Sequence, residues 1–126
     1  MNNLLMRAVF LAWLTIGLLL LISITVLAII IRFSHVSEMT ISFTALIIAF
    51  MILFISGLVA GIKGKANGLV LGLLTGSGFS LMTLIVQFLA FNDLFSLKQC
   101  LFHLAYILTT IVGSILGVNF AQLKQS

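Results

Sequence analysis

The sequence predicts an all-α integral membrane protein with one transmembrane domain, residues 1–126, in which four helices form an up-down bundle. Composition is the first reason, because 63% of the residues are hydrophobic and only 6% are charged. A soluble domain of this length leaves too much surface in water to hide so many apolar residues. The second reason is that charges divide the chain into four long uncharged windows. The third is that these windows lack the two-residue alternation of transmembrane β-strands.

The four windows each contain 24 to 27 residues, and a helix needs roughly 20 to cross the hydrocarbon. They cover residues 8–31, 39–62, 66–92 and 99–123. Within them we expect spans near 8–31, 41–62, 68–91 and 101–121. The connections are short, at 32–40, 63–67 and 92–100. Short connections favour antiparallel neighbours, hence an up-down order.

The first window is expected to stay in the protein as a span. Arg7 is followed by 24 uncharged residues, whereas the apolar region of a signal peptide typically has about 7–15. Residues 24–31, ITVLAIII, also offer no cleavage site of small residues.

The basic residues predict the orientation in the cell membrane. Four lie at the termini and in the middle turn, namely Arg7, Lys63, Lys65 and Lys124. The other two connections hold two basic and both acidic residues, namely Arg32, Lys98, Glu38 and Asp93. Because cytoplasmic loops carry an excess of Lys and Arg, we expect both termini and the 63–67 turn in the cytoplasm.

Glycines spaced by four are the main packing signal. Seven of the ten glycines fall between Gly57 and Gly78. Small residues at this spacing let the backbones of two membrane helices come close together. The predicted helix-packing residues are Gly57, Gly61, Gly64, Gly68, Gly72, Gly76, Gly113 and Gly117.

These small residues all belong to the predicted cytoplasmic half, so we expect a bundle that is tight at that end and wider at the other. A four-residue step turns a helix by about 400°, so the glycine ladder, which runs from Gly64 through Gly68, Gly72 and Gly76 to Ser80, drifts by roughly 40° per step. We therefore expect the second span to cover the start of this ladder, and another helix or subunit to cover its end. Two segments also resemble each other, ISGLVAGI at 55–62 and IVGSILGV at 111–118. Either a duplication or shared packing demands would explain the likeness.

The middle of the chain, GLVAGIKGKANGLVLGLLTG, resembles the YrzE-like family of small four-helix bacterial membrane proteins. The resemblance lies in a second span that ends in glycines, a short basic turn and a G-x-x-x-G-x-x-x-G third span. The length, the number of spans and the pair Gly113 and Gly117 also fit. The resemblance implies a protein common in Gram-positive bacteria. It implies no established activity, and it transfers no catalytic residue.

Candidate chemistry is sparse, because none of the four span cores contains Asp, Glu, Lys or Arg. Buried ionisable residues usually mark transport or catalysis inside a membrane. Gln87 and His103 are predicted at similar depth on neighbouring spans, where a hydrogen bond between them would join the helices. Cys100 and His103 are three residues apart, but no metal-ligand signature surrounds them, so we expect no metal and no cofactor.

The sequence thus favours a non-enzymatic structural or accessory subunit that packs through glycine-rich helix faces. Its partners would be the lipid bilayer and a membrane protein or further copies of itself, because the glycines exceed what one small bundle needs. Nucleic acid is not expected, since there is no basic stripe. The alternative is a small oligomeric channel or transporter with a polar line formed by Thr75, Ser77, Ser80, Thr83 and Gln87.

Overall fold

Four long helices make up the computed structural model, which describes the backbone of residues 2–125 and the side chains of residues 3–123. They are α1 (Asn2–Phe33), α2 (Glu38–Gly64), α3 (Gly68–Phe91) and α4 (Leu97–Gln125). Each helix is long and apolar enough to cross a membrane. The predicted class, an all-α membrane bundle of four helices, is confirmed. The third predicted span matches α3 at both ends, and the other helices extend beyond their predicted spans.

Local sequence explains where α2 begins and ends. The Ser37 side chain accepts a hydrogen bond from the Thr40 backbone N–H at 3.2 Å, and Glu38 lies in the first turn beside the positive end of the helix dipole. At the other end Lys65 adopts a left-handed backbone (φ 66°), and its N–H donates to the Gly61 carbonyl oxygen. Asn67, also left-handed, then leads directly into α3. A three-residue turn therefore joins the two helices.

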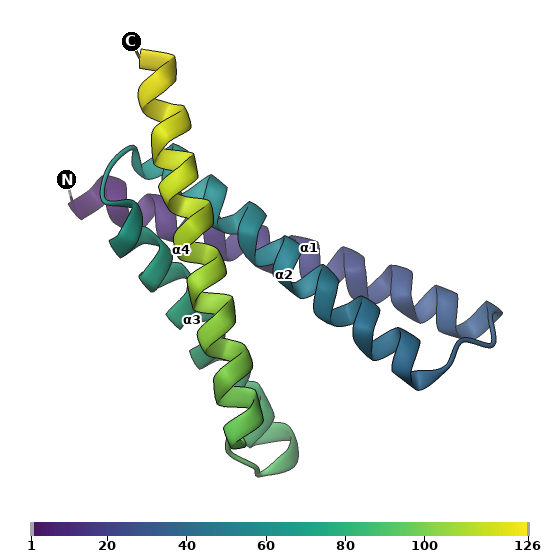
Figure 1. Cartoon of the computed structure of the whole chain (residues 1–126). Helices are drawn as coiled ribbons and strands as arrows, with labels where there is room; N and C mark the ends of the chain where they lie inside the picture. The colour runs from purple at the N-terminus through teal and green to yellow at the C-terminus, as the bar shows by residue number, and fades with distance from the viewer. Residues whose placement is uncertain (1, 126) are drawn as a thin grey trace.

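Two hairpins, α1–α2 and α3–α4, meet at one end of the molecule and diverge at the other (Figure 1). At the converging end α1 begins, α4 ends and the turn between α2 and α3 lies close by (Figure 1). Within the described residues α4 packs most extensively on α2 and next on α3, and none of its Cα atoms lies within 8 Å of a Cα atom of α1. Helix α4 thus contacts its own hairpin partner, α3, and also α2 of the other hairpin. Helix α1 packs on α2 and α3 from the side away from α4.

Buried side chains concentrate at the converging end. One cluster joins residues of all four helices, namely Ala8, Val9 and Ala12 of α1, Ala60 of α2, Leu71 of α3 and Val118 of α4. A second cluster of Ile16, Ile52 and Leu53 lies between α1 and α2, further from the converging end. The bundle is tight where the small residues gather and wide at the 34–37 and 92–96 loops, as predicted.

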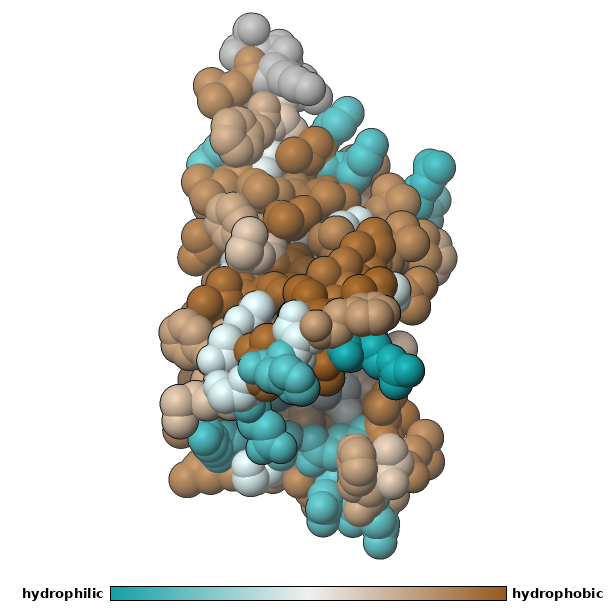
Figure 2. Space-filling model, turned by 90° about the vertical axis from the view of Figure 1, so that its right-hand side faces the viewer, coloured by the Kyte–Doolittle hydropathy of each residue, from teal (hydrophilic) through white to brown (hydrophobic). Residues whose placement is uncertain are grey.

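The surface is mostly hydrophobic, as expected for helices that face lipid. Seen from the side on which the α1–α2 loop lies, hydrophilic side chains gather around the loops, and a hollow separates the two diverging ends (Figure 2). The orientation of the termini relative to the cytoplasm stays a prediction from the basic residues.

Candidate functional site

Helices α2 and α4 cross through two facing glycine pairs. A Cβ atom built on Gly57 would lie 2.5 Å from the Thr110 carbonyl oxygen, and one built on Gly113 would lie 2.5 Å from the Phe54 carbonyl oxygen. Gly61 and Gly117 leave equally little room, because each would drive a Cβ against the backbone of the other helix. The similar segments 55–62 and 111–118 therefore face each other. Both helices run toward the same end, so this is a parallel G-x-x-x-G contact within one chain.

The glycines of α3 also face α4. A Cβ atom on Gly68 would lie 2.8 Å from the Cα of Ile115, and one on Gly76 would lie 2.9 Å from the Cα of Ile107. Gly72, between them, touches the backbone of Ile111.

The prediction that the second span covers the start of this ladder is therefore wrong. Because Gly113 and Gly117 let α4 approach α2, and the glycines of α3 let that helix approach α4, α4 takes the place between them. Gly64, the last residue of α2, makes room for the Leu71 side chain, which would lie 2.5 Å from a Cβ there. The predicted packing glycines are all in tight contact inside one chain, which removes the reason for expecting a partner at the ladder.

Two hydroxyl groups of α4 bind backbone carbonyl groups of α3 at the same crossing. Ser114 donates from Oγ to the Gly68 carbonyl oxygen, and Thr110 Oγ1 lies 3.1 Å from the Gly72 carbonyl oxygen and 2.7 Å from that of Ile107 in its own helix, so its one proton is shared between the two acceptors. Neither was singled out from the sequence. Their position beside the Gly113–Gly117 pair was the available signal, since Ser and Thr commonly hydrogen-bond across close membrane helices.

Trp13 fastens α1 to α3. Its indole ring packs directly on Gly78, and its N–H donates to the Thr75 carbonyl oxygen at 3.3 Å. Trp13 is 45% exposed, so its ring borders the lipid-facing surface, while its inner face is a helix contact that Gly78 makes room for.

The predicted hydrogen bond between Gln87 and His103 is not formed, and each residue has another partner. Gln87 and Gln99 exchange two amide hydrogen bonds, at 2.6 and 3.2 Å, and Gln87 also donates to the Leu94 carbonyl oxygen. His103 Nδ1 lies 2.8 Å from the Ser80 hydroxyl oxygen. The pairing differs because Gln99 also caps α4, accepting from the Ser96 backbone N–H, which holds it opposite Gln87.

Aromatic rings surround His103 where the hairpins begin to diverge. The Phe95 ring stacks on the imidazole with 4.4 Å between the ring centroids. The Tyr106 ring meets the imidazole edge-on, with 5.1 Å between the centroids. Phe50 of α2 in turn packs edge-on against Tyr106 at 4.9 Å. The imidazole is thus held within a packed cluster that links α2, α3 and α4.

The residues of the proposed pore line do not form one polar surface. Thr75 is buried, Ser80 is bound to His103, and Gln87 closes the 92–96 loop. The hydroxyl oxygens of Ser56 and Thr75 are buried without a hydrogen-bond partner among the described residues. These placements do not favour the channel alternative.

Metal ligands do not gather in the described part of the chain. No three His, Cys, Asp or Glu side chains among the described residues are arranged to hold a metal ion. Cys100 is an exposed free thiol at the start of α4. The candidate site is therefore not a metal site in the described residues; it is the crossing of α4 with α2 and α3, built from glycine, serine and threonine.

Comparison with known proteins places the chain in a family. A family model described as a protein of unknown function (DUF3792) matches residues 5–117. The uncharacterized membrane protein YrzE of Bacillus subtilis (strain 168) is 40% identical over 79 residues, which are 63% of this chain and 53% of that protein. The chain thus spans about half the length of this curated relative, and no solved structure matches. The resemblance inferred from the glycine pattern is confirmed, and the chain belongs to the DUF3792 family of membrane proteins of unknown function.

Proposed function

We propose that the protein is a non-enzymatic accessory subunit of the membrane, in which a rigid helix crossing holds two apolar hairpins apart for contact with a partner membrane protein. The observation that carries this proposal is how the strongest polar side chains in the spans are used. Gln87 and His103 both bond within the chain, as do the hydroxyls of Thr110 and Ser114. These hydrogen bonds hold helices together, so the polar groups serve the packing of the bundle.

The glycine crossing supplies rigidity rather than a partner surface. Close backbone contact excludes another helix from the same face, so a partner would meet the diverging parts of the hairpins. These parts expose large hydrophobic side chains on α3, including Phe88, Leu89 and Phe91. Exposed apolar side chains of this kind are compatible with lipid and with a second membrane protein alike.

Affinity purification from the host membrane in a mild detergent tests the proposal. The tagged full-length chain should retain a membrane protein at constant stoichiometry, and an unrelated four-span protein with the same tag should not. A purified chain that is free of partners and conducts ions or transports a solute in liposomes would refute the accessory role and favour the channel alternative.

A further inference from the structure

We propose that the seam between α2 and α4 at the diverging end seats one acyl chain of an anionic glycerophospholipid, with the lipid phosphate held by Lys98. This inference is independent of the accessory role, because it concerns a lipid and the seam between α2 and α4, whereas the exposed side chains named above for a partner lie on α3.

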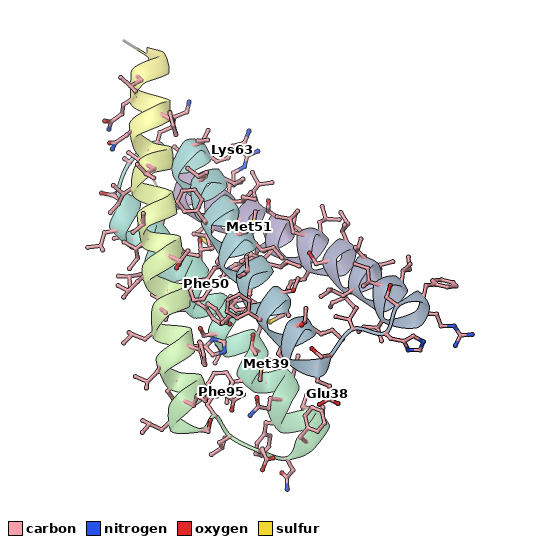
Figure 3. The ribbon with its side chains drawn as sticks, turned by 45° about the vertical axis from the view of Figure 1, so that its right-hand side comes forward. Glu38, Met39, Phe50, Met51, Lys63 and Phe95 are labelled. Atoms are coloured by element: carbon pink, nitrogen blue, oxygen red, sulfur yellow. The ribbon has the colours of Figure 1, made fainter. Side chains whose placement is uncertain are left out.

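Three adjoining hollows form one groove along this seam. The outermost, about 400 Å³, lies between Met39 of α2 and Lys98 of α4, and Lys98 and Phe102 line both it and the next hollow, of about 380 Å³. Phe50 lines the second hollow and the third, of about 340 Å³, which reaches Thr109. Figure 3 shows Phe50 between α2 and α4, and Met39 nearer the end of α2 that carries Glu38. The shared residues show that the three hollows follow one another along the seam.

The length of the groove matches one lipid leaflet. Lys98 and Thr109 are eleven residues apart on α4, which at 1.5 Å per residue corresponds to about 16 Å. Half of a hydrocarbon core of about 30 Å is about 15 Å. The groove ends where Gly57 and Gly113 bring the two backbones together. An acyl chain that entered beside Lys98 would therefore end near the middle of the membrane.

The walls favour a flexible acyl chain over a protein helix. Phe43, Phe50 and Phe102 line the groove, and close helix contact in membranes instead requires small residues at the interface. A helix with its side chains is about 10–12 Å across. An acyl chain is narrower and can follow the spaces between the rings.

The positive charge at the groove mouth favours a phosphate. Lys98 lies in the first turn of α4, which contains no acidic residue, and the N-terminus of a helix attracts anions. Among the described residues the Lys98 side chain has no ion-pair or hydrogen-bond partner. Glu38, the nearest acidic residue to the groove along α2, is exposed and likewise unpaired within the described chain. The Lys98 ammonium is consequently available to a headgroup.

Native mass spectrometry of the purified full-length chain tests this seat with phosphatidylglycerol and phosphatidylcholine of the same acyl composition. One phosphatidylglycerol should bind in preference, and Lys98→Gln should weaken its binding about fivefold, the effect of one lysine near a charged lipid. Lys63→Gln, which removes a lysine at the opposite end of α2, should bind as the wild type does. Equal weakening by both variants would reduce the effect to net charge and overturn the proposal.

A second pair of variants tests the acyl chain. Ala105→Phe places a ring inside the groove, and Leu104→Phe places one on the exposed neighbouring face of α4. Ala105→Phe should weaken the binding of both lipids, while Leu104→Phe should leave it unchanged. Thermal unfolding of each variant shows that the comparison is made between folded proteins. Wild-type lipid binding by folded Ala105→Phe would contradict the proposed seat.

Discussion

Replacing Gly72 by alanine should destabilise the bundle although alanine is the better helix former. The added Cβ would strike the backbone of Ile111 and the hydroxyl of Ser114, so α3 must move away from α4. Such overpacking costs about 1–3 kcal/mol. The movement also strains the bonds of Thr110 and Ser114 to α3, at about 0.6 kcal/mol each, and alanine returns up to about 1 kcal/mol in helix propensity. The net loss in the free energy of unfolding is therefore about 1–3 kcal/mol.

Unfolding in a titration with sodium dodecyl sulfate measures this loss. Trp13 is the single tryptophan, and its ring packs on Gly78 of α3, so its fluorescence reports the separation of the helices. Gly17→Ala is the matched control, because no atom of the described residues lies within 4 Å of a Cβ at Gly17. That variant should be as stable as the wild type or slightly more so. Equal midpoints for Gly72→Ala and Gly17→Ala would refute the assigned α3–α4 contact.

Three further predictions concern the rest of the chain. A reporter that is active only outside the cytoplasm should stay silent when fused after Ser126, and activity there would reverse the orientation inferred from the basic residues. Ser114→Ala should lower the free energy of unfolding by about 0.6 kcal/mol. Thr109→Ala is the control, because the Thr109 hydroxyl bonds within α4 and its loss should not weaken the α3–α4 contact. Equal losses in the free energy of unfolding would mean that the bond from Ser114 to α3 does not stabilise the bundle. Removing Cys100 or His103 should leave the metal content of the purified protein unchanged, and a stoichiometric metal that is lost in either variant would reveal a site.

Composition and charge were sufficient to predict the four helices. Uncharged windows bounded by residues such as Lys65 set the spans, and for α3 both boundaries agree with the structure. The spacing of glycines also located the tight end of the bundle. These properties are local, because the backbone in lipid must be helical and because small residues permit close approach.

The pairing of the helices could not be predicted in the same way. A four-residue spacing identifies a face of α3, but it does not say that Gly68 will meet Ile115 of α4, which Gly113 and Gly117 hold close against α2. The amide pairing depends on Gln99, whose role as a helix cap fixes its position opposite Gln87. Which helices pack against each other depends on all four helices together, so a single stretch of sequence does not determine it.

Cutting the turn between α2 and α3 in the folded protein tests the central claim most directly, namely that α4 packs between α2 and α3 and holds the hairpins together. A protease site inserted at the exposed residues 65–67 would allow cleavage after membrane insertion. The two fragments should elute as one complex in mild detergent, and Gly61→Leu, which places a large side chain against Ser114 and Gly117, should separate them. Fragments of the otherwise unaltered protein that separate on cleavage, or fragments carrying Gly61→Leu that stay together, would contradict the claim.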